Sequence, residues 1–310
     1  MRLIPVFLRL VRWPNLVFIG ITQLLFFFCI VVPNFEEAGV QPNLSGFRWL
    51  LLVVSSVLIA AAGNIINDYF DLNIDIINKP QHVVIDKHIK RRWAIVWHIV
   101  LSLIGILIGF YIDATSRVKF LGFANAACVL LLFVYSISLK KKLLIGNIVI
   151  SLLTAWTVLV ISYAETSNLL FGDRELTMKL TRISFLYAGF AYIISLVREV
   201  VKDMEDINGD RIYGCKTMPI VWGMVASRIF VSVWLVILII LLCIVQFYVL
   251  QFGWWISAIY CILLIIVPLL LLFKRLARAN NPADYHRISS QVKWIMLAGI
   301  FSMIFFRIFG

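Results

Sequence analysis

The chain has 310 residues, of which 62% are hydrophobic and 14% are charged, and its mean hydropathy is +0.98. Soluble domains are usually about 45–50% apolar, so the composition excludes an ordinary soluble protein and indicates an integral membrane protein. The formal net charge of +12 raises the question of nucleic-acid binding, which the positions of the basic residues argue against.

Nine apolar runs are predicted to cross the membrane as helices, because about 20 apolar residues span a bilayer. Their connections are short, so residues 1–310 are expected to form one all-α, polytopic domain. The first run follows several arginines, as a signal peptide would, but it is too long and lacks a small-residue cleavage site. The predicted spans are residues 13–32, 48–67, 94–112, 118–138, 143–163, 181–198, 229–250, 253–273 and 291–308.

Lysine and arginine concentrate in the N-terminus and in the even-numbered loops between these spans. This asymmetry is the positive-inside pattern, and it accounts for most of the basic excess without a nucleic-acid partner. The N-terminus is therefore predicted to be cytoplasmic and the C-terminus external. The remaining charge suits anionic membrane lipids or a phosphorylated substrate.

The first acidic cluster lies at the predicted cytoplasmic end of the second span, from Asn67 to Asp75. If the helix continues past Asn67, the i, i+4 spacing places Asn67, Asp71 and Asp75 on one face, with Asp68 beside them. Such residues also cap helices or make turns, which is the alternative interpretation of one cluster taken alone.

The second cluster follows the sixth span. Four of its acids, Glu199, Asp203, Asp206 and Asp210, are spaced by 4, 3 and 4 residues, which again predicts one helical face. The Asn208-Gly209 pair favours a turn, so Asp210 is expected just beyond the helix end. Both clusters fall on the predicted cytoplasmic side, and we expect them to face each other across a single cavity.

Carboxylates at a membrane boundary are costly unless they hold a cation or pair with bases. Mg²⁺ takes one or two carboxylates, keeps waters and fills its remaining positions with phosphate oxygens. The two stripes are therefore expected to hold Mg²⁺ and a diphosphate between them. Arg198, Lys202 and Arg211 are expected to neutralise the charge that develops on a departing diphosphate.

Two further segments lie at the same predicted side of the membrane. Tyr135 and Ser136 precede the lysine run that begins at Lys140, and an interfacial aromatic with topology-setting lysines is the simplest interpretation. Arg12 and Asn15 flank a proline that suits the opening of a helix.

With these residues in place, the chain resembles the UbiA superfamily of intramembrane prenyltransferases over nearly its whole length. The first motif of that superfamily, N-D-x-x-D-x-x-x-D, is similar to the first cluster, and D-x-x-x-D is similar to Asp206 and Asp210, with Asp203 one turn earlier. Tyr135, Ser136 and Lys140 resemble the Y-S/T-x-x-L-K segment, and Arg12 and Asn15 resemble an R-x-x-N opening.

The resemblance implies nine transmembrane helices around a central cavity and Mg²⁺-dependent transfer of a polyprenyl group from its diphosphate to a lipophilic acceptor. It implies catalytic roles for Asp71, Asp75, Asp206 and Asp210, and metal binding by these four together with Asn67. It implies substrate contacts for Arg12, Asn15, Asp68, Tyr135, Ser136, Lys140, Arg198, Lys202 and Asp203.

The segments Ile77–Pro80 and Arg198–Arg211 are most similar to the geranylgeranylglyceryl-phosphate geranylgeranyltransferase branch, which implies a geranylgeranyl donor and that acceptor. The loop after Pro80 departs from the R-P-I-P-S-G pattern, and the usual arginine is absent unless His82 replaces it.

The alternatives are transfer to haem or to an aromatic quinone precursor of the naphthoate, hydroxybenzoate or homogentisate type. An ion-coupled transporter and a non-catalytic cation-binding protein are alternatives of other classes. Transporters are expected to carry broken helices and a substrate site near the bilayer midplane, whereas the acids here lie at the ends of the spans.

Overall fold

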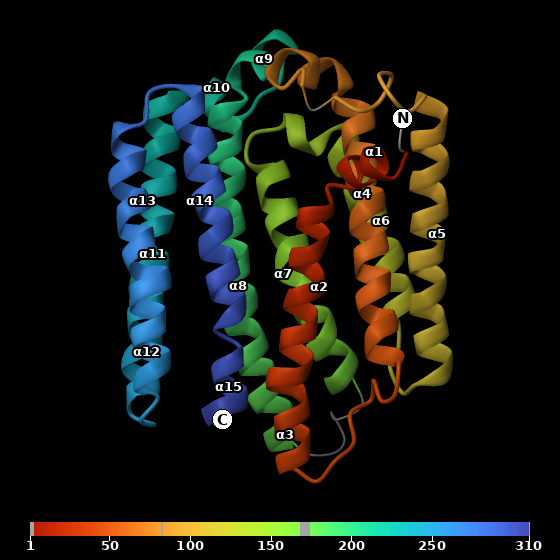
Figure 1. The fold of residues 1–310 in the computed structure, drawn as a ribbon, viewed down its shortest axis with the longest axis vertical. Helices are drawn as coiled ribbons and strands as arrows, with labels where there is room; N and C mark the ends of the chain where they lie inside the picture. The colour runs from red at the N-terminus through yellow and green to blue at the C-terminus, as the bar shows by residue number, and fades with distance from the viewer. Residues whose placement is uncertain (1–2, 82, 168–173, 310) are drawn as a thin grey trace. The chain divides into compact units, whose positions relative to one another are not determined.

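The computed structural model describes residues 3–81, 83–167 and 174–309. In these ranges the regular elements are helices, as the composition predicts (Figure 1). Eight are long and apolar enough to span a membrane, and a ninth, α6 (Leu121–Ile137), is shorter. The eight long ones are Trp13–Glu37 (α2, η1, α3), Arg48–Asn78 (α4), Arg91–Thr115 (α5), Ile145–Thr166 (α7), Arg174–Glu205 (α8), Gly223–Leu250 (α11), Trp255–Arg278 (α12, η4, α13) and Pro282–Phe309 (α14, α15).

These nine helices follow the order of the nine predicted spans, so the all-α, multi-span architecture is confirmed. They group into two compact units. Unit 1 is Met1–Lys140 with Trp156–Leu186, and unit 2 is Lys141–Ala155 with Tyr187–Gly310. Because α7 and α8 contribute residues to both units, the units are described one at a time and the single domain stays a prediction.

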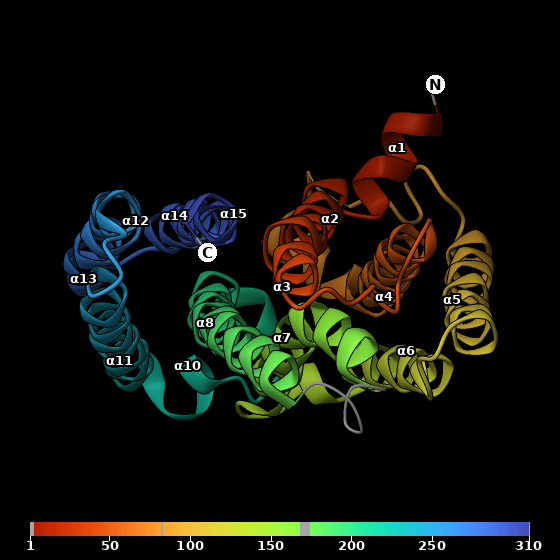
Figure 2. The ribbon, with the colours of Figure 1, turned by 90° about the horizontal axis from the view of Figure 1, so that it is seen from below.

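In unit 1, α4 packs along α5 and α6, and α2 lies against α4 (Figures 1 and 2). A buried polar network joins α4, α5 and α6. Asn125 Nδ2 donates to Ser55 Oγ at 2.8 Å and to the Gly105 carbonyl at 3.1 Å, and Ser55 Oγ donates to the same carbonyl at 2.8 Å. Small residues let transmembrane helices approach closely, and such side chains bond across them.

Gly109 lies where α5 approaches α6. A Cβ at this position would lie 2.9 Å from Gly122 Cα and 2.6 Å from Asn125 Nδ2. Because the obstruction includes backbone, we expect Gly109→Ala to destabilise the protein by about 1–3 kcal/mol. The measurement is the thermal unfolding temperature in detergent.

Gly20→Ala in α2 is the matched control, because a Cβ there would meet no described atom within 4 Å beyond its chain neighbours and the local backbone of its own helix. We expect this variant to unfold at the wild-type temperature or slightly above it, since alanine favours the helix. Equal losses in the two variants would contradict a close contact between α5 and α6.

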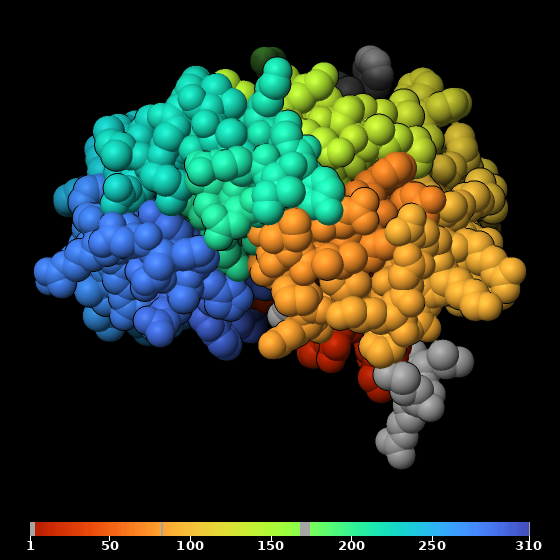
Figure 3. Space-filling view, turned by 90° about the horizontal axis from the view of Figure 1, so that it is seen from above, coloured from red at the N-terminus to blue at the C-terminus, as the bar shows by residue number. Residues whose placement is uncertain are grey.

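The segment between α4 and α5 is packed onto the end of unit 1. Val83, Val84 and Ile85 are buried in one cluster with Leu10 and Leu72. Seen from above, the end of α4 and this segment lie on the visible face of unit 1 (orange in Figure 3). The loop that departs from the family pattern is therefore anchored by its own apolar residues.

In unit 2, α8, α11, α13 and α14 surround an aliphatic core that contains Val197, Val231, Leu269 and Val292. The short helices α9 (Ile207–Ile212) and α10 (Met218–Val221) connect α8 to α11. His286 Nδ1 lies 3.0 Å from Glu205 Oε1 and ties the start of α14 to the end of α8. The second acidic motif therefore lies at the same end of unit 2 as the α13–α14 connection.

The seventh long helix contains one π-helical turn, η4 (Ile262–Ile266), between α12 (Trp255–Cys261) and α13 (Val267–Arg278). The Val267 amide donates to the Ile262 carbonyl, one residue further back than in an α-helix. Pro268 follows at once and has no amide to donate, which explains the irregular turn at this place.

Candidate functional site

The first acidic motif lies on one continuous helix. Since α4 extends to Asn78, the expectation that the helix continues past Asn67 is confirmed. Asn67 Nδ2 donates to Asp71 Oδ2 at 2.8 Å, as residues one turn apart on the same face can do. Asp75 follows one turn later, and its carbonyl accepts the Lys79 amide at 2.8 Å where the helix ends.

Lys140 reaches this motif from the short helix η2 (Leu139–Lys141) that follows α6. Its Nζ lies 2.6 Å from Asp71 Oδ1 and donates to Asn67 Oδ1 at 3.2 Å. The Lys140 side chain is 9% exposed and that of Asp71 is 17% exposed. An ammonium and a carboxylate this enclosed are costly unless they compensate each other, so Asn67, Asp71 and Lys140 form one charged group.

Arg12 forms a second charged contact with α4. Its backbone is left-handed, with φ of 54°, and its carbonyl accepts the Asn15 amide at 2.9 Å. Its Nη2 donates to Asp68 Oδ1 at 2.5 Å, and Asp68 raises the pKa of Arg12 above its usual value. Asn64 Nδ2 donates to the Val11 carbonyl at 2.9 Å and fixes the same turn, although Asn64 belongs to none of the predicted motifs.

Tyr135 and Ser136 lie in the last turn of α6. Ser136 is buried, and its Oγ donates to the Leu132 carbonyl at 2.8 Å within the same helix. Tyr135 is half-buried beside it. Lys140 connects the Y-S-x-x-L-K segment to the first motif.

In unit 2, α8 continues to Glu205 and carries the bases of the second cluster. Glu199 Oε1 accepts from Arg198 Nη1 at 3.0 Å and from Lys202 Nζ at 2.9 Å. Arg198 Nε is buried and has no hydrogen-bond partner. The Glu199 carboxylate therefore holds the two cations side by side, and Arg198 keeps one buried N–H group that has no hydrogen-bond acceptor.

Asp203 is held from a neighbouring helix. Asn147 Nδ2, on the part of α7 that belongs to unit 2, donates to Asp203 Oδ2 at 2.8 Å. Asn147 is buried and belongs to none of the predicted motifs. The available signal was an amide side chain within the apolar run 143–163.

The predicted stripe of the second cluster is interrupted. The helix α8 ends at Glu205, Asp206 has φ of −94° and ψ of 9°, and α9 begins at Ile207. Asp210 lies beyond the end of α8, as expected, but Asn208 and Gly209 lie inside α9, so the expectation that this pair forms the turn is wrong. The bond from the Asp206 amide to the Lys202 carbonyl closes the last turn of α8, and the chain changes direction at Asp206.

In the ranges that the structure describes, no group of three or more His, Cys, Asp or Glu side chains could hold a metal ion. Mg²⁺ does not require such a group, because it usually binds one or two carboxylates and completes its shell with water and phosphate. The hard oxygens of Asn67 and Asp71 fit this requirement in unit 1. His82, the candidate replacement for the family arginine, lies outside the described residues.

Comparison with known proteins gives consistent matches. A model of the UbiA prenyltransferase family matches residues 15–298. Digeranylgeranylglyceryl phosphate synthase of Methanothermobacter thermautotrophicus is 35% identical over 193 residues, 62% of each chain. The synthase of the same name from Methanosphaera stadtmanae is 30% identical over 243 residues, 78% of this chain and 81% of the relative.

Solved structures show the same fold. A structure of digeranylgeranylglyceryl phosphate synthase superposes with a TM-score of 0.61 at 25% identity and covers 98% of this chain and 99% of the other. A UbiA homologue from Archaeoglobus fulgidus, bound to DMAPP and Mg²⁺, gives a TM-score of 0.58 at 15% identity and covers 96% and 98% of the two chains.

Proposed function

This chain belongs to the UbiA prenyltransferase family, and from this premise we propose that it transfers a geranylgeranyl group from its diphosphate to geranylgeranylglyceryl phosphate. The family match and the membrane-spanning helices together identify the chain as a multi-pass membrane prenyltransferase. The observation that carries the proposal is the contact of Lys140 with Asn67 and Asp71. Relatives that bear the synthase name support the choice of acceptor.

Mg²⁺ would be held by the side-chain oxygens of the two acidic motifs, Asn67, Asp71, Asp75, Asp206 and Asp210. Their oxygens are the ligands that this ion prefers, and Asp71 already lies against a cation, Lys140. Mg²⁺, when bound, would neutralise charge on the diphosphate leaving group. The UbiA homologue that binds DMAPP and Mg²⁺ supports this ligand chemistry.

Lys140, Arg198 and Lys202 would bind the diphosphate oxygens. Each now lies against a carboxylate, Asp71 or Glu199, so a phosphate would replace one anionic partner with another at little desolvation cost. Charge-assisted hydrogen bonds of this kind are the stronger ones. As the allylic C–O bond breaks, the diphosphate retains the electron pair. The acceptor hydroxyl then bonds to C1 and gives up its proton, for which the released diphosphate is a base, while apolar helices limit access by water.

The other proposed substrate contacts are Arg12, Asn15, Asp68, Tyr135, Ser136 and Asp203. Arg12 and Asp68 act as a pair in this proposal, since they share a 2.5 Å contact. We further propose that units 1 and 2 form one catalytic domain whose two acidic motifs share a cytoplasm-facing cavity. The family match across residues 15–298, which includes both units, supports one domain.

The test is an assay of the purified full chain in detergent with labelled geranylgeranyl diphosphate. The acceptor panel contains geranylgeranylglyceryl phosphate, a naphthoate, a hydroxybenzoate, homogentisate and haem. We expect product with the glyceryl phosphate and Mg²⁺-dependent release of diphosphate. Prenylation of an aromatic acceptor instead would show that the proposed acceptor is wrong. Ion transport without diphosphate release would overturn the enzyme assignment.

A further inference from the structure

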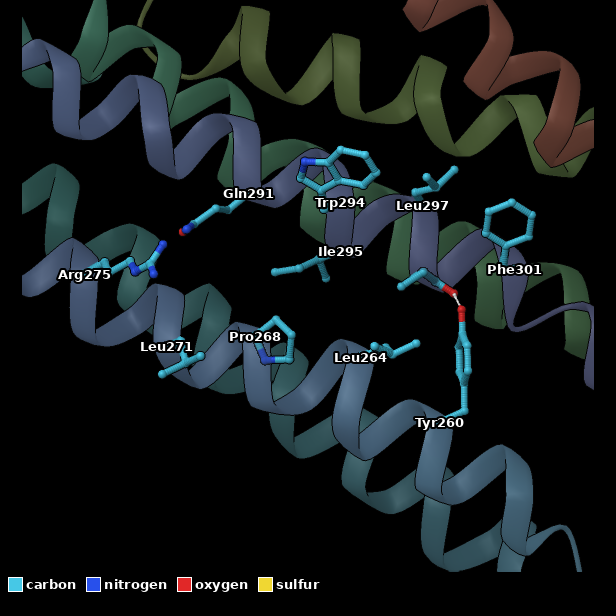
Figure 4. Close-up of a pocket in the computed structure, with 11 residues that line it drawn as sticks. Tyr260, Leu264, Pro268, Leu271, Arg275, Gln291, Trp294, Ile295, Leu297 and Phe301 are labelled. Carbon is cyan, nitrogen blue, oxygen red and sulfur yellow. Dashed lines mark hydrogen bonds between the residues drawn. The ribbon is translucent and has the colours of Figure 1, made fainter.

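A groove runs along unit 2 between α13 and α14 (Figure 4). Its volume is about 410 Å³, which is within the range of about 300–1,000 Å³ of small-molecule sites. Most of the lining is apolar. Trp294 is 71% exposed there, and Leu264 and Leu271 are each about half exposed. Leu269 and Leu272 of the same helix are buried in the core of unit 2, so the groove lies on the face of α13 next to this core, and the core residue Ile295 also lines it.

The irregular turn of the seventh long helix contributes to this groove. Leu264 lies within η4 and Pro268 follows it, and both line the groove. At the far end, Tyr260 Oη donates to the Ala298 carbonyl at 2.9 Å and closes the space between the two helices. Single π-helical turns occur frequently at functional sites, and here the turn accompanies an opening between neighbouring helices.

The other end of the groove is basic. Arg275 and Gln291 extend toward the opening from α13 and α14 (Figure 4). Among the described residues, Arg275 has no hydrogen-bond or ion-pair partner. No acidic side chain lines the groove, and Arg278 adds a further positive charge in the last turn of α13. A guanidinium beside an amide matches the geometry of a phosphate group.

The length of the groove matches one leaflet of a membrane. Leu264 and Arg275 are 11 positions apart, which corresponds to about 16 Å of helix. The hydrocarbon core of a bilayer is about 30 Å thick, so half of it is about as deep as this groove. A lipid whose phosphate reaches Arg275 can therefore place one chain alongside Leu271 and Leu264.

We propose that this groove binds one anionic phospholipid of the surrounding membrane. The lipid phosphate contacts Arg275 and Gln291, and one hydrocarbon chain lies along Leu271, Leu264 and Trp294. The site is independent of the proposed function, because none of these residues belongs to the acidic motifs. The basic end of the groove lies at the same end of unit 2 as the second motif, since His286 and Glu205 join α14 to α8 at that end.

The test uses the full chain in mixed detergent micelles with phospholipids brominated on their chains, because bromine quenches nearby tryptophan fluorescence. The contribution of Trp294 is obtained by subtracting the signal of Trp294→Phe. We expect brominated phosphatidylglycerol to quench Trp294 at about fivefold lower concentration than brominated phosphatidylcholine. Arg275→Gln is expected to remove this preference.

Arg278→Gln is the matched control, because it removes the same charge from the same helix end but does not line the groove. It is expected to retain most of the preference. Equal quenching by the two lipids in the wild type would overturn the proposal. So would displacement of the lipid by excess geranylgeranyl diphosphate, since the groove would then belong to the prenyl substrate.

Discussion

Asp71→Ala and Asp206→Ala are each expected to reduce kcat/KM for prenyl transfer by at least about 100-fold, while the protein still inserts and folds. Each change removes a carboxylate proposed to hold the metal–diphosphate group, and Asp71→Ala also leaves Lys140 without its 2.6 Å partner. The measurement is transfer of labelled geranylgeranyl by purified variants, with thermal unfolding as the check of folding. Wild-type turnover in either variant would refute the site assignment.

Glu37→Gln is the matched control for the loss of one carboxylate. Glu37 is exposed and pairs with Lys179 at 2.8 Å, at the end of its span away from the first motif. We expect wild-type activity from this variant, because exposed ion pairs contribute little.

The double variant Asp71→Ala/Asp206→Ala tests whether the two motifs serve one site. Residues that act as a unit are strongly non-additive, so we expect the double variant to lose no more activity than the more affected single variant. If the two losses multiply, the motifs act independently and the shared cavity is wrong.

Removal of divalent metal is expected to have an equally large effect. We expect a chelator to abolish both prenyl transfer and diphosphate release, and added Mg²⁺ to restore them. Ca²⁺ is expected to restore them poorly, because it prefers a larger, more flexible shell of about 6–8 oxygens. The measurement is release of diphosphate from labelled donor after dialysis against each ion.

The chelated protein is expected to remain folded, which separates a catalytic metal from a structural one. Lys140 already compensates Asp71, and Asn67 bonds to both residues, so this part of the first motif has a cation without metal. The thermal unfolding temperature should therefore change little on chelation. Undiminished transfer in the chelator would contradict the assignment of Mg²⁺.

Much of the fold follows from local properties of the chain. Apolar runs of membrane-spanning length predicted the helices in order, and the i, i+4 spacing of Asn67 and Asp71 predicted a shared face that their 2.8 Å hydrogen bond bears out. The path after Glu205 was not predicted correctly, because the propensity of Asn208-Gly209 for a turn gave way to a short helix that starts after Asp206.

The membrane class, the family and the positions of the acidic motifs can be read from the amino-acid sequence, because hydropathy and spacing along one helix are local quantities. Which side chains from other helices meet those acids depends on how the helices pack. Lys140 reaches Asp71 from beyond α6, and Asn147 reaches Asp203 from α7. These contacts depend on how helices far apart in sequence pack together, and the separation along the chain does not encode them in any local pattern.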